Sequence, residues 1–225
     1  DKAVNPTSVM GATKRIAEFL TVNMNSFCGT KFTTVRFGNV LGSNGSVVPL
    51  FKDQLKKGGP LTVTHPDIRR FFMLIPEAVQ LVLIASALGH GGEIFVLDMG
   101  SPVKIIDLAE NFIRLSGFSP HKEIKIRFTG LRPGEKLYED LFDETERIIP
   151  TGHKKLMMAV PDIPSADELT AHLAELEHVV NNYAISDVIP KLQTIVPNFK
   201  SGISDAVATE GGVGPVSART GAKRP

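Results

Sequence analysis

The chain has 225 residues, of which 42% are hydrophobic and 22% are charged, as in an ordinary globular protein. A formal net charge of +1 argues against a nucleic-acid surface over the whole molecule, so we expect no nucleic-acid partner. No stretch approaches the ~18 apolar residues of a membrane span, so we expect no membrane contact from this chain. The single cysteine, Cys28, excludes an internal disulfide and indicates the cytoplasm; we interpret it as a small buried residue.

Hydrophobic periodicity and turn residues predict alternating helices and strands along the chain. A first helix begins at Thr7 or Ser8, after Pro6, and runs to about residue 25. The further predicted elements are a strand at 31–37, a loop at 38–46, a helix at 47–57, strands at 61–64 and 70–74, a helix at 76–88, a strand at 93–97, a helix at 105–115, a strand at 123–128, a short helix at 135–142, and helices at 165–183 and from about 186 to before Pro197.

This alternation predicts the α/β class with a largely parallel sheet. Together with the family resemblance described below, it leads us to expect four regions in chain order. The resemblance implies that 1–42 is the remnant of a dinucleotide-binding Rossmann domain and that 43–145 is a smaller α/β substrate-binding region interleaved with the last Rossmann elements. We expect 146–200 to be a C-terminal helical extension and 201–225 to be a disordered tail poor in large apolar residues.

The first fifteen residues read as the edge of an active site. Asp1 and Lys2 are adjacent ionisable groups that can divide acid and base work, or else form a solvated surface pair. Met10 and Lys14 are four residues apart and therefore share one helical face; Met10 taken alone is typical of a packing residue. Because a domain rarely starts with its chemistry, we expect the chain to be the C-terminal piece of a longer protein.

Further along, a loop and two arginine-containing segments indicate a site for a nucleotide diphosphate. The loop at 38–46 is rich in Gly, Asn and Ser, which suits either a phosphate site or a flexible turn. Its glycines lack the G-x-G-x-x-G spacing of a dinucleotide fingerprint. Arg70 and Arg132 match diphosphate geometry, and Glu135 can accept hydrogen bonds from ribose hydroxyls; each alone could be a surface residue. The histidines show no metal-ligand spacing, so we expect no metal.

Six sequence motifs occur in an order that identifies a family resemblance. They are residues 1–6 (DKAVNP), 10–14 (MGATK), 36–40 (RFGNV), 45–49 (GSVVP), 91–95 (GGEIF) and 131–136 (LRPGEK). Together they resemble the C-terminal part of polysaccharide-biosynthesis nucleotide-sugar dehydratases. These are extended short-chain dehydrogenases, typified by the CapD-like UDP-N-acetylglucosamine 4,6-dehydratases. The resemblance covers about residues 1–143.

The resemblance implies NAD-dependent 4,6-dehydration of a UDP-N-acetylhexosamine, with NAD favoured over NADP. Hydride leaves sugar carbon 4, a proton leaves carbon 5, water leaves carbon 6, and the hydride returns to carbon 6. The implied roles are Asp1 as the acid, Lys2 as the base at carbon 5, Lys14 with the cofactor ribose, Val40 beside the cofactor, Asn39 on the substrate phosphate, Arg70 and Arg132 as the diphosphate clamp, Glu135 on the ribose, and Val47 and Val48 in the uracil pocket.

Met10 departs from the general family pattern, because it stands where a tyrosine usually takes the carbon 4 hydroxyl proton. A thioether cannot exchange a proton. Large membrane-anchored members also carry Met-x-x-x-Lys, so the resemblance implies a parent anchored in the bacterial inner membrane with this domain on the cytoplasmic side. It also implies a homo-oligomer when full length. A Ser or Thr before Asp1 is a plausible substitute for the tyrosine.

Two other functions remain open on these residues. The chain could belong to a UDP-sugar 4-epimerase or reductase of the same fold, although Asp1 and Lys2 favour dehydration, since an epimerase expels no water. It could also be a non-catalytic module that binds nucleotide sugars, with Met10 marking the loss of activity. We expect the isolated chain to be inactive, because the cofactor-binding half with its glycine fingerprint lies outside it.

Overall fold

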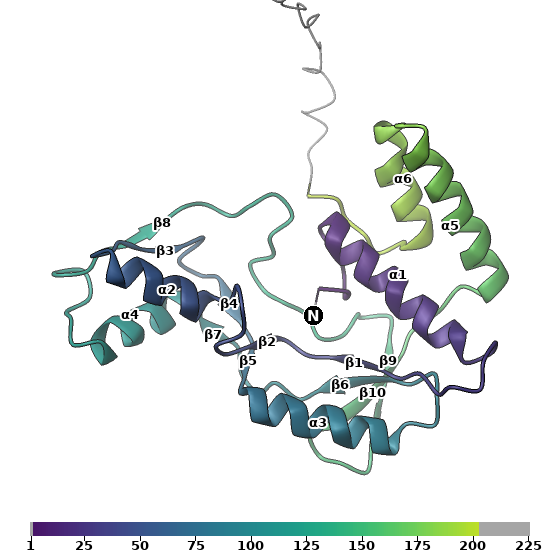
Figure 1. Ribbon diagram of the computed structural model, residues 1–225, viewed down its shortest axis with the longest axis horizontal. Coiled ribbons are helices and arrows are strands. Elements are labelled where there is room, and N and C mark those ends of the chain that lie inside the picture. Colours follow the sequence, from purple (N-terminus) through teal and green to yellow (C-terminus); the bar gives the residue numbers. More distant parts are fainter. Residues whose placement is uncertain (1, 203–225) are drawn as a thin grey trace, which may run out of the picture.

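A four-stranded sheet between helices forms the larger part of the molecule, and a smaller lobe projects from one end of it (Figure 1). The computed structural model describes residues 2–202. Within them the helices are α1 (Val9–Met24), α2 (Val47–Lys56), α3 (Ile75–Leu88), α4 (Ile105–Leu115), α5 (Ala166–Asn181) and α6 (Ile185–Ile195). The strands are β1 (Thr34–Arg36), β2 (Asn39–Val40), β3 (Leu61–Val63), β4 (Arg69–Arg70), β5 (Phe72–Met73), β6 (Ile94–Leu97), β7 (Val103–Lys104), β8 (Ile126–Phe128), β9 (Arg147–Pro150) and β10 (Leu156–Val160).

The main sheet has the order β1-β6-β10-β9 and mixed strand directions. Strand β6 runs parallel to β1 and antiparallel to β10, which in turn is antiparallel to β9. All four residues of β6 are buried, as its uninterrupted apolar run predicts for a central strand. The predicted α/β class is confirmed. However, the range 146–200, expected to be a helical extension, supplies two strands before its two helices.

Helices cover both faces of this sheet. Successive side chains along β6 point to opposite faces, so alternate residues pack against different helices. Phe95 and Leu97 point to the α3 side, where they pack with Leu81. Ile94 and Val96 point to the opposite side, where Val22 of α1 packs against them. The result is a three-layer arrangement with α1 above and α3 below the sheet in Figure 1.

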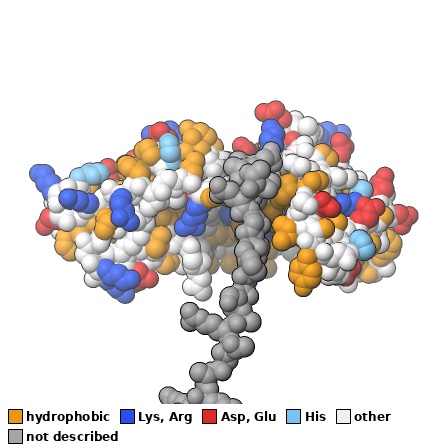
Figure 2. Space-filling view, turned by 90° about the horizontal axis from the view of Figure 1, so that it is seen from above, with side chains coloured by type: hydrophobic (Ala, Val, Ile, Leu, Met, Phe, Trp, Pro, Cys, Tyr) orange, Lys and Arg blue, Asp and Glu red, His pale blue; other side chains and the backbone are white. Residues whose placement is uncertain are grey.

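The smaller lobe has its own apolar core. Helices α2 and α4 pack on the parallel pair β3–β8 around Phe51, Leu61 and Ile113, whose side chains are fully buried. The short pairs β2–β5 and β4–β7 connect this lobe to the main sheet. Figure 2 shows basic side chains gathered over the lobe end of the molecule. The proposed boundaries at residues 42 and 145 stay predictions.

The C-terminal helices pack on α1. Leu169 of α5 and Leu192 of α6 join Ala12 and Phe19 of α1 in one buried cluster. The start of α5 is fixed by a capping box in which the Ser165 side chain and the Glu168 side chain each bond the other's backbone N–H. This arrangement makes α1 the helix that joins the sheet to the C-terminal pair.

Two sequence expectations are wrong. Residues 135–142 do not form a helix, because the carbonyl oxygens of Lys136 and Leu137 accept hydrogen bonds from Arg69 and Arg70 instead of from later amides. Cys28 is exposed rather than buried. The predicted disordered tail lies outside the described residues from 203 onward. No helix among residues 2–202 combines the length and apolarity needed to cross a bilayer.

Candidate active site

The N-terminal turn and the first turn of α1 place Lys2, Met10 and Lys14 together. The Ser8 hydroxyl caps α1 by accepting a hydrogen bond from the Gly11 amide at 3.2 Å. A Cβ at Gly11 would lie 2.6 Å from the Lys2 carbonyl oxygen, so only glycine lets the turn pack this closely. The glycine of the Met-Gly-Ala-Thr-Lys motif therefore holds Lys2 beside the helix. Asp1 lies outside the described residues.

Two cavities meet at Lys2. The first, of about 420 Å³, is bordered by Lys14 and Glu18 of α1 and by the residues of β1. The second, of about 450 Å³, is bordered by Met10, whose side chain is 54% exposed, and by Asn39. Lys2 borders both, so a ligand that spans the two cavities passes its ammonium group.

A third cavity, of about 670 Å³, continues the groove into the smaller lobe. It shares Arg70, Arg132 and Glu135 with the second cavity and is bordered by Val47. Val48 is half-buried on the same helix and is not among the residues that border this cavity, and Val40 packs against the apolar cluster between α3 and the main sheet. The three cavities thus bring most of the predicted site residues into one groove, while Val40 contributes to packing.

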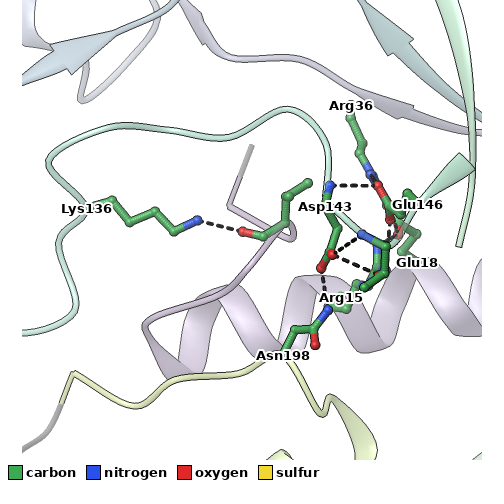
Figure 3. A network of polar contacts seen from close by, with 9 residues as sticks. Arg15, Glu18, Arg36, Lys136, Asp143, Glu146 and Asn198 are labelled. Atoms are coloured by element: carbon green, nitrogen blue, oxygen red, sulfur yellow. Dashed lines mark hydrogen bonds and ion pairs between the residues drawn. The ribbon is translucent and has the colours of Figure 1, made fainter. Parts of the chain in front are cut away.

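Residues 132–139, which connect the smaller lobe to the sheet, lie along the N-terminal turn. The Thr7 hydroxyl donates to the Gly134 carbonyl at 2.8 Å, and the Lys136 ammonium donates to the Val4 carbonyl at 2.8 Å (Figure 3). Gly134 has φ of +73°, and a Cβ there would lie 2.6 Å from the Thr7 carbonyl oxygen. The segment is therefore held by tertiary contacts that fix one wall of the groove.

The Arg70 guanidinium is occupied within the protein. Its Nη1 donates to the Arg69 carbonyl at 2.8 Å, and its Nη2 donates to the Lys136 carbonyl at 2.9 Å. Its Nε lies 3.1 Å from the Glu139 carboxylate, and Nη2 lies 3.5 Å from that of Glu135. A diphosphate clamp needs N–H groups that can reach the ligand, so Arg70 in this arrangement anchors residues 132–139.

Arg132 and Glu135 have the exposure that ligand residues need. Arg132 is exposed, and its side chain forms no ion pair with any residue in the range 2–202. The Glu135 carboxylate accepts the Arg132 amide at 3.0 Å and the Thr64 hydroxyl at 3.1 Å, which fixes its direction. Arg132 therefore borders the second and third cavities with a guanidinium that no carboxylate of residues 2–202 engages.

Glu139 is a site residue that the sequence reasoning missed. Its carboxylate, only 8% exposed, lies 3.9 Å from the Lys2 ammonium and accepts a hydrogen bond from the Asn39 side-chain amide at 3.0 Å. The same amide nitrogen also donates to the Phe71 carbonyl at 3.2 Å. Glu139 sits just beyond the Leu-Arg-Pro-Gly-Glu-Lys motif in the segment wrongly predicted as helix, so no spacing signal pointed to it.

A closed square of two arginines and two glutamates is buried under the groove (Figure 3). Arg36 binds Glu18 through Nε at 2.7 Å and Glu146 through Nη1 at 2.7 Å. Arg15 completes the square at 2.5 Å from Glu18 and 2.9 Å from Glu146. Because Arg15 and Glu18 belong to α1 and Arg36 ends β1, the square fixes these two elements relative to each other. Glu18 and Arg36 also border the first cavity, so the square supports its wall.

These contacts shift the pKa values of Arg36 and Glu146 in the directions that favour charge. Burial by itself lowers the pKa of Arg36, but hydrogen bonds to Glu18 and Glu146 outweigh it and raise that pKa. Burial likewise opposes ionisation of Glu146, yet the hydrogen bonds from Arg36 lower its pKa. Asp143, bonded to Thr145 and to Asn198, also has a lowered pKa despite its burial.

Among residues 2–202, no group of three His, Cys, Asp or Glu side chains is arranged to hold a metal ion. The cationic groups that border the cavities are lysines and arginines, which suit an anionic ligand.

Comparison with known proteins identifies related sequences. The profile of the family described as polysaccharide biosynthesis protein matches residues 1–161. The capsular polysaccharide biosynthesis protein CapD of Staphylococcus aureus is 63% identical over 147 residues, 65% of this chain and 24% of CapD. An uncharacterized membrane protein of Methanocaldococcus jannaschii is 56% identical over 65% of this chain and 45% of that protein. A UDP-glucose 4-epimerase of Rickettsia bellii is 43% identical over 65% of this chain and 42% of the epimerase. The chain thus spans about a quarter to under half the length of these relatives.

Solved structures agree with the fold. Pen from Bacillus thuringiensis superposes with a TM-score of 0.62 and 38% identity, covering 73% of this chain and 51% of that one. The dTDP-glucose 4,6-dehydratase DesIV from Streptomyces venezuelae, with NAD bound, gives a TM-score of 0.52 at 20% identity, covering 59% and 41%. The second likeness concerns the fold alone, which is that of Rossmann-type nucleotide-sugar dehydratases and epimerases.

Proposed function

Because this chain belongs to the polysaccharide biosynthesis protein family, we propose that it forms the substrate-binding part of an NAD-dependent nucleotide-sugar 4,6-dehydratase. The proposed substrate is a UDP-N-acetylhexosamine, with UDP-N-acetylglucosamine as the first choice. The observation that carries this proposal is a row of three cavities in which Lys2 borders the first and second, and Arg70, Arg132 and Glu135 border the second and third.

The two ends of the groove suit the two ends of a nucleotide sugar. In the proposed complex the uracil lies in the third cavity against Val47, with Val48 behind it on the same helix, and the Glu135 carboxylate accepts hydrogen bonds from the ribose hydroxyls. Arg132 binds the diphosphate as a fork of charged donors, while Arg70 and Asn39 shape the wall beneath it. The sugar then extends into the second cavity, toward Met10 and Lys2.

The residues around the first cavity fit the nicotinamide end of NAD. The Lys14 ammonium is exposed at a polar cavity, where it can donate to a ribose diol, and Thr34 has a buried hydroxyl without a partner among the described residues. Val40 lies behind this region in the apolar packing. Bound NAD supplies a reversible acceptor for the hydride that leaves sugar carbon 4 and returns at carbon 6.

Lys2 and Asp1 perform the proton transfers in this proposal. Lys2, at the junction of the cavities, removes the proton from carbon 5, and Asp1 donates a proton to the departing hydroxyl at carbon 6 so that water leaves. Met10 presents a thioether to the sugar and takes no proton. The proton from the carbon 4 hydroxyl is therefore accepted by a different group.

Mass spectrometry of the reaction tests the proposal directly. The complete gene product, incubated with UDP-N-acetylglucosamine, should give a nucleotide sugar that is lighter by one water. Lys2→Met and Asp1→Asn should stop this loss while the affinity for UDP stays near that of the wild type. Intact UDP binding without any water loss in the wild type would contradict the dehydratase assignment.

A second candidate is 4-epimerisation, which the likeness to the Rickettsia bellii epimerase favours. An epimerase would leave the mass unchanged and invert carbon 4, so the same experiment separates the two reactions. We further propose that the chain lies on the cytoplasmic side of a membrane-anchored, homo-oligomeric parent; the likeness to a membrane protein of Methanocaldococcus jannaschii supports the membrane anchor alone. Fractionation of cells that express the complete gene product tests that location.

A further inference from the structure

The Glu139 carboxylate, on a side chain that is 8% exposed, contacts three of the residues that the sequence predicted for the site. Glu139 itself was not predicted. We propose that Glu139 is a positioning residue that sets the places of Lys2, Asn39 and Arg70 for the reaction. The inference rests on the proposed function. In the proposed reaction Glu139 transfers no proton. It acts by holding neighbouring residues that do contact the substrate.

The three partners come from three separate parts of the chain, and Glu139 is the contact that they share. Lys2 lies in the N-terminal turn, Asn39 in β2 and Arg70 in β4. Oxygen Oε1 of Glu139 lies 3.1 Å from Nε of Arg70 and 3.9 Å from Nζ of Lys2, and Oε2 accepts from Nδ2 of Asn39 at 3.0 Å. One side chain therefore relates the acid–base end of the groove to its binding wall.

The contacts of Glu139 favour a positioning role over proton transfer. Both of its oxygens are engaged by donors and its side chain is 8% exposed, although the residue also borders the second cavity. A carboxylate held by two charged groups and an amide keeps a fixed direction. Such a group is better suited to fix geometry than to exchange protons.

The charge of Glu139 also makes a prediction that a purely structural contact does not make. A carboxylate near a diphosphate site repels the ligand, so it weakens binding while it improves the placement of Lys2. Removal of the charge should therefore affect binding and turnover in opposite directions. A residue that only stabilised the fold would lower both together.

The experiment compares Glu139→Gln with Asp140→Asn. The control removes the same charge at the next position, where the carboxylate is 48% exposed and pairs only with Lys136 among residues 2–202. UDP affinity is measured calorimetrically on the 225-residue chain, and kcat and KM with UDP-N-acetylglucosamine on the complete gene product. Thermal unfolding of every variant reports whether the fold is kept.

For Glu139→Gln we expect kcat to fall about tenfold to hundredfold, as for a misplaced catalytic group, with UDP bound about twofold to fivefold more tightly. Asp140→Asn should change both values less than about twofold. Glu139→Asp keeps the charge but shortens the side chain, so kcat should fall while UDP affinity stays unchanged. This variant carries the test if the glutamine variant fails to fold.

Three outcomes would overturn the positioning role. They are an unchanged kcat in Glu139→Gln, a parallel loss of UDP affinity and turnover in a folded variant, or an equal effect of Asp140→Asn. Failure of the proposed function looks different, because the wild-type protein would then show no UDP binding or no water loss. The two failures are therefore distinguishable in one set of measurements.

Discussion

The buried square and the groove wall are both built from charged side chains, yet they differ in exposure and in pairing. In the square, Arg15 and Arg36 are matched by Glu18 and Glu146, and all four residues are at most 7% exposed. In the groove, Lys2 is 44% exposed, and Arg132 is exposed with no ion-pair partner among residues 2–202. The square satisfies its charges internally, whereas the groove keeps positive charge available to solvent.

This difference separates two uses of charge in one small region. A closed set of buried ion pairs contributes little net stability by itself, but losing one member leaves the others uncompensated. Such a set specifies how α1, β1 and the 143–146 turn fit together. The groove, in contrast, combines the paired Arg70 with the exposed Arg132, whose guanidinium pairs with no carboxylate of residues 2–202, and so keeps positive charge within reach of an anionic ligand. Substitutions in the two regions should consequently affect different measurements.

The largest expected effect comes from breaking the square. Arg36→Met should lower the free energy of unfolding by about 3–5 kcal/mol, because Glu18 and Glu146 stay buried with one arginine between them. Urea denaturation measures this loss. The matched control is Arg114→Met, at a 55% exposed arginine paired with Glu110, where about 1 kcal/mol or less is expected. Equal losses in the two variants would show that burial of the square has no energetic consequence.

The next effect separates two arginines of the groove. Arg132→Ala should weaken UDP binding by about tenfold or more, since a charge-assisted contact contributes about 1.5–3 kcal/mol, and should leave the unfolding free energy unchanged. Arg70→Ala should instead lower stability, because it removes the donors to the Lys136 and Leu137 carbonyls. Calorimetric titration and urea denaturation of both variants test this contrast. A stable Arg70→Ala protein that has lost UDP binding would reverse the assignment.

Acid should weaken the square. The pKa values of Glu146 and Asp143 are lowered in the folded protein, so the unfolded chain binds more protons at low pH. Their contribution to stability is complete above the unfolded pKa values, about 4.3 for Glu and 3.9 for Asp, and is lost as pH falls through the folded values. Urea denaturation between about pH 6 and pH 3 should show this decline. In Glu146→Gln the decline should be shallower, and an unchanged slope would contradict the role of Glu146.

The smallest effect lies outside both charged regions. Ser165→Ala removes the side chain that caps α5 and should lower the unfolding free energy by about 1 kcal/mol. UDP affinity should not change, since α5 packs on the side of α1 that faces away from the N-terminal turn and the smaller lobe (Figure 1). A change in UDP affinity in this variant would show that the C-terminal helices influence the site, and would weaken the contrast between structural and binding charges.

Local patterns predicted the helices well because each carries its own signals. The apolar stripe of α4 gave both of its ends, and Pro6 with Ser8 gave the start of α1. The short strands β9 and β10 were missed because their exposure patterns depend on the pairing of β10 with β6 and of β9 with β10, and the first of these lies outside any local window. The false helix at 135–142 had helix-forming residues, but Arg69 and Arg70 take the carbonyls that such a helix needs.

By itself, the sequence determined the α/β class, the family and most residues of the groove, because motifs with fixed local geometry carry them. Lys2, Met10 and Lys14 are related through a single helix start, and that relation survives without tertiary information. Only the tertiary structure decided how Arg70 and Arg132 differ and that Glu139 lies between Lys2, Asn39 and Arg70. The physical reason is that hydrogen-bond partners more than thirty residues apart are set by the packing of segments, which no sequence spacing encodes.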